Sequence, residues 1–349
     1  MYRPSVRLRL ALAAGLLGLS TTACDDGTSP SADFEAGPMV DAMAEMVAVT
    51  DGLDDALHSV AIATAQFGLS ADVEVDPYPS RPDLAAMEAS PTPSASVLPL
   101  QHLGKTFVWD PAAGMYVEAT TSSAPADAIR VLYYAIDPVT EAPASPLNPL
   151  GYVELRDLST DASNRLNVEV VYEPVGASPV VLADYWVDVA FTLTQAGLTY
   201  NAASRGFFSN GTDQLNFQYA QALSMSETAM SLTQSFDLDM EGTGNAVSLA
   251  LSFNGDPATE SGTLDMTAGI TNGAETMVFS LAVDEQEAVD GQVLYQNQPV
   301  ALIGGTVDAP TFTDRNGDPL SQEQVQELVA LWQGIFGMFD VAEGFGTQS

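Results

Sequence analysis

Cysteine and histidine are nearly absent from this chain of 349 residues, which has one cysteine, Cys24, and two histidines, His58 and His102. A single cysteine excludes a disulfide within the chain. Catalytic zinc usually needs three protein ligands and a Ser-His-Asp triad needs a partnered histidine, so both sites are close to excluded. Asp54 precedes His58 by four residues, a spacing typical of a solvent-exposed pair on a helix. The motifs GxGxxG, GxSxG, HExxH and the P-loop are also missing. The sequence therefore predicts a protein that is not an enzyme and has no cofactor.

Positive charge is scarce as well, with 10 Lys and Arg residues against 46 Asp and Glu residues and a formal net charge of −36. Removal of residues 1–23 would take three arginines and no acid, leaving a net charge of about −39. Nucleic acid and anionic lipid surfaces are therefore poor partners. We interpret the acidic excess as a surface adapted to salt water, with a calcium-loaded surface as the alternative.

Long hydrophobic runs are limited to the start of the chain. Three arginines precede an apolar run from Leu10 to Leu19, and small residues follow up to Ala23. The run is too short for a retained membrane-spanning helix. This pattern is typical of a secretory signal peptide over residues 1–23.

The stretch Leu19-Ser20-Thr21-Thr22-Ala23-Cys24-Asp25 resembles the lipobox of bacterial lipoproteins. The resemblance implies that the Cys24 thiol receives a diacylglycerol, that residues 1–23 are removed, and that the new amino terminus carries a further acyl chain such as palmitate. Two or three chains make a stable anchor, so the expected location is the cell envelope, on a membrane, facing the periplasm or the outer surface. Thr21 stands where leucine is usual, which leaves ordinary cleavage with a free Cys24 as the alternative.

The next part of the chain is expected to contain a tether, a helix and a linker. Residues 24–37 are small, polar and acidic, as in a flexible tether. Residues 38–68 place apolar side chains three and four apart, which predicts an amphipathic helix. Residues 69–104 are rich in proline and predict an extended linker.

From residue 105 the apolar residues alternate with polar ones for about 200 residues, which predicts about a dozen strands. The segments 106–109 and 115–118 predict a hairpin, and the Asn-Gly pairs at 210–211, 254–255 and 272–273 predict hairpin turns. A last hairpin is expected around Asn297-Gln298. The alternation does not tell whether these strands form one sheet or two.

The chain is expected to end in a helix over residues 322–340. Ser321 and Gln324 fit a capping box, and an apolar stripe that includes Trp332 and Phe336 follows. We predict a mainly β domain over residues 105–340: a large antiparallel meander curled into an open barrel, half-barrel or sandwich. Since strands twist against one another, its apolar face should be covered by the amphipathic helices at the N- and C-terminal ends.

This layout is similar to the LolA/LolB-like half-barrels that carry lipoproteins. The resemblance implies lipid binding. The strand count, the two terminal helices and the methionines of the first helix also favour a non-catalytic binder of lipid or another apolar ligand, in a pocket that would include Met39, Met43, Met46, Trp332 and Phe336. The alternative is a structural or protein-interaction lipoprotein with a solid core and no ligand. The oligomeric state stays open.

Two groups of acidic residues are candidate sites. Asp314, Asn316 and Asp318 are spaced like the first cation ligands of a calcium loop, but Pro319 and Val325 stand where glycine and glutamate are needed. We expect a turn leading into the last helix, with a bound metal as the alternative. Asp237, Asp239 and Glu241 alternate with apolar residues on a strand, which favours a solvated face over the carboxylate pair of a hydrolase.

Overall fold

The computed structural model describes residues 37–50, 56, 98–137, 139–140, 142–160, 163–194, 197–257, 259 and 261–347. The signal peptide, Cys24, the tether, His58 and most of the predicted linker lie outside the described residues. The side chains of Leu193 and of residues 336–347, and so that of Phe336, also lie outside the description.

The described chain is mainly β, with one large, mostly antiparallel sheet and a helix toward each end of the chain. Fifteen strands are hydrogen-bonded in the order β17-β16-β15-β14-β13-β12-β11-β10-β9-β8-β7-β6-β3-β1-β2, and β4 pairs separately with β5. The sheet is not closed, because β17 and β2 stand at the two ends of this order. Apart from β4 and β5, the named strands therefore form one sheet and not two.

The chain divides into two compact units. Unit 1 contains residues up to 46, Thr192–Tyr200 and Ala220–Ala342, and unit 2 contains Val47–Phe191, Asn201–Tyr219 and residues 343–349. The boundary passes through single continuous elements, namely the first helix, strands β8, β9 and β10, and the last helix.

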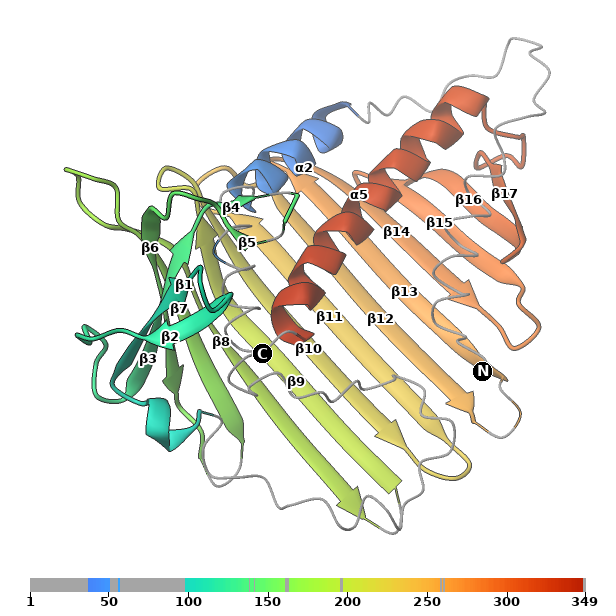
Figure 1. The fold of residues 1–349 in the computed structure, drawn as a ribbon. Helices are drawn as coiled ribbons and strands as arrows, with labels where there is room; N and C mark the ends of the chain where they lie inside the picture. The colour runs from blue at the N-terminus through green and yellow to red at the C-terminus, as the bar shows by residue number, and fades with distance from the viewer. Residues whose placement is uncertain are drawn as a thin grey trace. The chain divides into compact units, whose positions relative to one another are not determined.

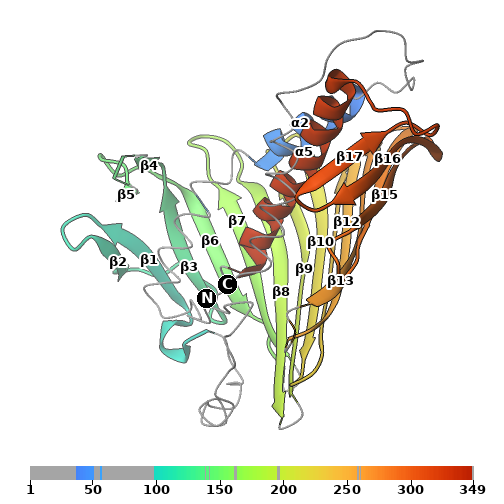
Figure 2. The same cartoon turned by 90° about the vertical axis from the view of Figure 1, so that its right-hand side faces the viewer.

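Unit 1 consists of an antiparallel meander with helices on one face (Figures 1 and 2). Its strands and helices are α2 (Gly37–Thr50), β11 (Met230–Met240), β12 (Ala246–Asp256), β13 (Ser261–Asn272), β14 (Glu275–Val283), β15 (Val289–Tyr295), β16 (Gln298–Thr306), β17 (Ala309–Thr313) and α5 (Gln322–Thr347). Alternation puts the apolar side chains on one face of these strands and mostly small polar ones on the other.

Unit 2 contains the strands that precede this meander and one short helix. They are η2 (Leu100–His102), β1 (Lys105–Asp110), β2 (Met115–Glu118), β3 (Ala128–Tyr134), β4 (Ile136–Asp137), β5 (Ala142–Pro143), β6 (Pro149–Asp157) and β7 (Asn164–Tyr172). The strands β8 (Val180–Thr194), β9 (Gly197–Ser209) and β10 (Gln214–Met225) belong partly to each unit.

The expected meander is interrupted at its beginning. Strands β1 and β2 form the predicted antiparallel hairpin, with Phe107 opposite Glu118. Strand β3, however, pairs with β1 and runs parallel to it, with Thr106 beside Arg130. This parallel pair is an exception within the predicted antiparallel meander. It arises because the segment between β2 and β3 crosses β1 instead of forming a tight turn.

Strand β9 was not predicted, because small residues break its alternation. Ala202 and Ser204 are buried on it, and Gly206 follows two residues later. A Cβ atom at Gly206 would lie 2.2 Å from the Asp184 carbonyl oxygen and 2.4 Å from Tyr185 Cβ. A side chain at position 206 would therefore clash with the neighbouring strand at Asp184 and Tyr185, and glycine avoids this clash.

Two of the three predicted Asn-Gly turns lie within one residue of their expected positions. Gly211 lies in the β9–β10 loop and Gly273 in the β13–β14 loop, both with positive φ. Gly255 instead lies inside β12, opposite Met230 on one side and Gly262 on the other. The prediction of a turn here was wrong. The Phe253 ring packs over both glycines, and its Cζ atom would lie 2.7 Å or less from a Cβ atom added at either one. The ring therefore covers the backbone that the glycines leave exposed within the strand.

The last predicted turn is displaced by one residue. Gln296 and Asn297 form it, with φ angles of 52° and 62°, and Tyr295 pairs with Gln298. Two consecutive positive φ angles are what a two-residue hairpin loop between right-twisted strands requires.

Both terminal helices exist, with different bounds from those expected. Helix α2 occupies Gly37–Thr50, and the rest of the predicted helix over 38–68 lies outside the described residues except for Ala56. Helix α5 extends to Thr347 rather than to residue 340. Its predicted capping box is present: the Ser321 N–H donates to Gln324 Oε1 at 3.1 Å, and the Gln324 N–H donates to Ser321 Oγ at 3.3 Å.

Candidate functional site

The candidate functional site is the apolar face of unit 1, beneath α2 and α5. One row of directly paired residues crosses six strands of this face, and no member is more than 2% exposed: Phe236, Leu249, Ala268, Phe279, Val293 and Ala301. Such a row would be open to water in an uncovered sheet. Its burial means that other parts of the chain cover this face.

Helix α2 is attached to the turns of unit 1 by polar contacts from residues distant in sequence. The Asn272 side-chain amide donates to the Pro38 carbonyl oxygen at 2.7 Å, and that of Asn245 donates to Glu45 Oε2 at 3.0 Å. Met39 and Met46 are fully buried. Their burial follows the predicted helix face, whereas the two amide contacts could not be seen in the sequence.

Helices α2 and α5 contact one another on this face. A Cβ atom added at Gly334 of α5 would lie 2.7 Å from Met43 Sδ and 2.8 Å from its Cε. Glycine in a helix interior costs about 1 kcal/mol relative to alanine. Here it leaves space for a methionine of the other helix.

A small apolar pocket lies between α5 and the last strands of unit 1. The Trp332 ring packs edge-on against Phe279, with 5.5 Å between ring centroids. Beside it, a cavity of about 30 Å³ is lined by apolar residues, which are Phe279, Leu281, Val289, Ile303, Val307, Pro310, Phe312, Leu328, Val329 and Trp332. This volume accommodates about two water-sized spheres, whereas ligand pockets measure about 300–1,000 Å³.

The predicted pocket residues do not all meet at this cavity. Trp332 lines it, but Met39, Met43 and Met46 lie on α2, and Met43 contacts the position of Gly334 instead. The strand residues that line the cavity were missed. Their alternation marked them as core residues but contained no sign of a gap between them.

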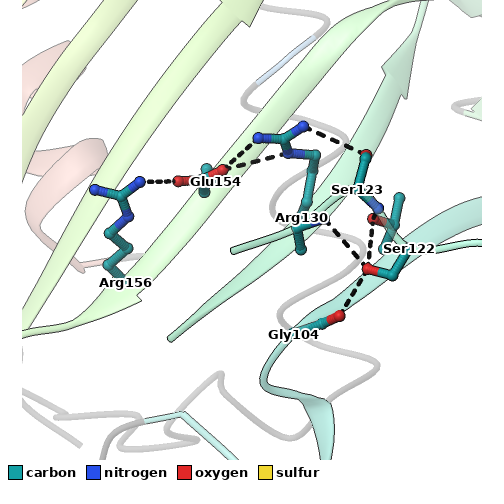
Figure 3. Close-up of polar contacts among 8 residues, drawn as sticks. Gly104, Ser122, Ser123, Arg130, Glu154 and Arg156 are labelled. Atoms are coloured by element: carbon teal, nitrogen blue, oxygen red, sulfur yellow. Dashed lines mark hydrogen bonds and ion pairs between the residues drawn. The ribbon is translucent and has the colours of Figure 1, made fainter. Parts of the chain in front are cut away.

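Unit 2 carries a second notable arrangement on the polar face of its sheet (Figure 3). Glu154 of β6 is 2% exposed, and its carboxylate lies between two guanidinium groups. Arg130 donates to Glu154 Oε2 from Nη2 at 2.6 Å and also to Ser123 Oγ, while Arg156 contacts Glu154 Oε1. The Arg130 guanidinium also lies 3.8 Å from the centroid of the Tyr152 ring.

Strand register extends this cluster into a row of charged residues. Arg130 lies opposite Glu154, Glu154 opposite Glu169, and Glu169 opposite Asp184. Partial burial, and then the nearby charges of Glu154 and Asp184, raise the pKa of the Glu169 carboxyl above its ordinary value. The row therefore contains one carboxylate, that of Glu154, which is paired with two arginines, and another, that of Glu169, whose raised pKa disfavours ionisation.

The opposite face of unit 2 is an aromatic core. The Phe208 and Phe217 rings are stacked with centroids 4.5 Å apart, and Tyr185 contacts both edge-on. Burial raises the pKa of the Tyr185 hydroxyl. The polar row thus lies on the face of the sheet opposite to this aromatic core.

The Asp314 loop is a closed turn, as expected. Asp314 Oδ1 accepts the backbone N–H groups of Asn316 and Asp318 at 2.8 and 2.9 Å, and Oδ2 accepts the Asn316 amide. These bonds, that from Asp318 most of all, lower the pKa of the Asp314 carboxyl. Within the described residues, no group of three or more His, Cys, Asp or Glu side chains is arranged to bind a metal ion.

The other candidate groups lie apart from the helix-covered face. Asp237 and Asp239 are exposed on β11, on the face opposite to Phe236 and Leu238, and Glu241 is exposed in the turn that follows. The His102 ring packs edge-on against Phe107 in unit 2.

Comparison with protein-family models, with curated proteins and with solved structures finds no match for this chain. Among the described residues, no helix is both long enough and apolar enough to cross a membrane.

Proposed function

We propose that this chain is an envelope lipoprotein, attached to a membrane through acylated Cys24, that acts without catalysis through its protein surface. The anchor is supported by the basic, apolar and small residues before Cys24 and by the lipobox-like stretch around it. In this proposal the folded units are held beside the membrane by the tether over residues 24–37.

The observation that carries the surface role is the occupation of the apolar face of unit 1 by the chain's own helices. The row from Phe236 to Ala301 is buried, Met43 fills the space at Gly334, and the cavity at Trp332 measures about 30 Å³. A fatty acyl chain needs several times this volume. A filled face leaves the exposed strands and helix surfaces to contact partners.

The second candidate is a binder of lipid or another apolar ligand. It is favoured by the wholly apolar lining of the cavity beside α5. A ligand of ordinary size would require α5 to move away from β14–β17, which would expose Leu328 and Trp332 unless the ligand replaced their contacts. This candidate therefore predicts that bound ligand and a displaced α5 occur together.

Two measurements test the proposal. For the anchor, we expect the intact chain to remain with membranes and Cys24→Ser to be released, with the mass of a diacylglyceryl group on the amino-terminal peptide of the intact chain only. For the surface role, we expect native mass spectrometry and solvent extraction of the purified Cys24→Ser protein to find no bound lipid. Stoichiometric lipid in that protein would favour the second candidate, and retention of Cys24→Ser on membranes would contradict the anchor.

A further inference from the structure

Helix α2 is apolar on two sides. Its buried side chains face the sheet, while Val40 and Val47 are 42% and 45% exposed on the outer side. Ala44 and Ala48 are also exposed, and the spacing of 40, 44, 47 and 48 places all four residues in one line along the helix. We call these four residues the outer stripe of α2.

The outer stripe cannot turn inward, because α2 is held by contacts on its other side. Pro38 and Glu45 accept the hydrogen bonds from Asn272 and Asn245, and Met39 and Met46 are fully buried. Rotating the helix to cover Val40 would break both hydrogen bonds and expose both methionines. The stripe is therefore a stable apolar surface of the folded chain.

The chain length outside the structure places this surface close to the proposed anchor. Gly37, where α2 begins, is 13 residues after Cys24. A fully extended segment of this length spans at most about 45 Å, roughly the full thickness of a bilayer. An acylated Cys24 thus keeps α2 within reach of the lipid surface at all times.

Charge on the helix selects the kind of lipid surface. Helix α2 has no basic residue, and Asp41 is exposed beside the outer stripe. An anionic surface would repel this acid, whereas zwitterionic head groups carry no net charge. Two exposed valines bind a bilayer only weakly by themselves, but a tether makes the contact intramolecular and raises its effective concentration.

We propose that the outer stripe of α2 lies against the zwitterionic bilayer to which Cys24 is anchored. This inference rests on the proposed function, since the anchor brings the helix to the lipid. It adds that the folded chain has a fixed membrane-facing helix rather than hanging freely from its tether.

The test uses the full acylated chain, in which Cys24 is blocked and an added cysteine is the free thiol. Val40→Cys and, separately, Val47→Cys are labelled with a polarity-sensitive fluorophore and reconstituted into phosphatidylcholine vesicles. Val175→Cys is the matched control, because Val175 is fully exposed on the loop between β7 and β8. We expect a blue shift and quenching by brominated lipid at positions 40 and 47, and neither change at 175.

The outcomes separate this inference from the proposed function. Suppose that mass spectrometry confirms a diacylglyceryl group on Cys24. If the labels at 40 and 47 then show no more blue shift or quenching than the label at 175, the inference is overturned and the proposed anchor is not affected. Labels that are already shielded before vesicles are added overturn it in favour of a protein cover, either a second copy or another part of this chain. An unmodified Cys24 overturns both.

Discussion

At the scale of single residues, two glutamates of unit 2 differ strongly in their burial and in their charged partners. Glu154 is buried and contacts two arginines, whereas Glu118 on β2 pairs with Lys105 with both side chains more than one third exposed. Removing one member of a buried pair leaves the other charge without its partner, while an exposed pair is screened by water. The two ion pairs should therefore differ greatly in their contribution to stability.

We expect Glu154→Gln to lower the free energy of unfolding by about 3 kcal/mol, because it removes the buried carboxylate that both Arg130 and Arg156 contact. Glu118→Gln, the matched control, should cost less than about 1 kcal/mol. Urea denaturation of both variants measures the difference. Equal effects would mean that the buried carboxylate has no special role in holding β3 and β6.

Glu169 should make stability depend on pH. Its pKa in the folded chain lies above the ordinary value of 4.5, so the folded state binds the proton more tightly than the unfolded state. The contribution to the free energy of unfolding is therefore greatest below pH 4.5 and falls as pH rises through the raised pKa. Glu169→Gln removes this ionisation.

We expect Glu169→Gln to be more stable than the parent protein at about pH 7, with the gain shrinking as the pH falls toward the ordinary carboxyl range. Glu173→Gln is the control, because it removes the same charge at an exposed position outside the row. Denaturation curves at several pH values give the comparison. A gain that is the same at every pH, or equal to that of the control, would contradict the prediction.

At the scale of elements, the two described helices are governed by different kinds of interaction. The start of α5 is local: Ser321 and Gln324 satisfy each other's backbone N–H groups within one turn. The position of α2 is not local, since its partners Asn245 and Asn272 lie more than 190 residues away. The capping box could therefore be predicted from the sequence, and the placement of α2 could not.

We expect Ser321→Ala to lower the free energy of unfolding by about 1 kcal/mol through loss of the cap. Gln326→Ala, the control, also introduces alanine into α5 but at an exposed position. Its free energy of unfolding should stay within about 0.5 kcal/mol of that of the parent protein. Thermal unfolding followed by circular dichroism compares the two. A cap variant as stable as the control would show that α5 does not depend on its first turn.

The contact between Met43 and Gly334 offers a test of packing between α2 and α5. Gly334→Leu should destabilise unit 1 by about 1–3 kcal/mol, because the new side chain enters space occupied by Met43. The double variant Gly334→Leu with Met43→Ala should recover part of this loss. A coupling energy near zero in the double-mutant cycle would mean that the helices do not share this space.

At the scale of the whole molecule, the charge imbalance is the dominant property. With 46 acidic and 10 basic residues, each acid has many like charges around it and few partners. Self-repulsion of this kind opposes the compact state and keeps the protein soluble. Two of the 10 basic residues, Arg130 and Arg156, contact the same carboxylate, that of Glu154.

We expect sodium chloride to stabilise the protein. Raising its concentration from about 0.01 M to about 1 M shortens the Debye length from roughly 30 Å to roughly 3 Å and screens the repulsion. The melting temperature should rise steeply at the low end of this range. Sucrose at the same osmolality controls for excluded-volume effects, and a melting temperature that is independent of salt would contradict the prediction.

The sequence by itself determined the features that depend on neighbouring residues. Alternation identified most of the strands, asparagine and glycine marked two of the three predicted Asn-Gly turns, and Ser321 with Gln324 marked the start of α5. The burial of Met39, Met46 and Trp332 followed from helix periodicity. These features could be predicted because the pattern that indicates each of them lies within a few residues of the chain.

Only the tertiary structure decided the features whose partners are distant in the chain. Gly255 lies in a strand because it pairs with Met230 of β11 and Gly262 of β13, β9 forms opposite Tyr185 despite its broken pattern, and β3 runs parallel to β1. The filled face of unit 1 and the row of charges in unit 2 are also of this kind. Contacts between residues far apart in sequence depend on the register of the whole sheet, and no local pattern contains that information.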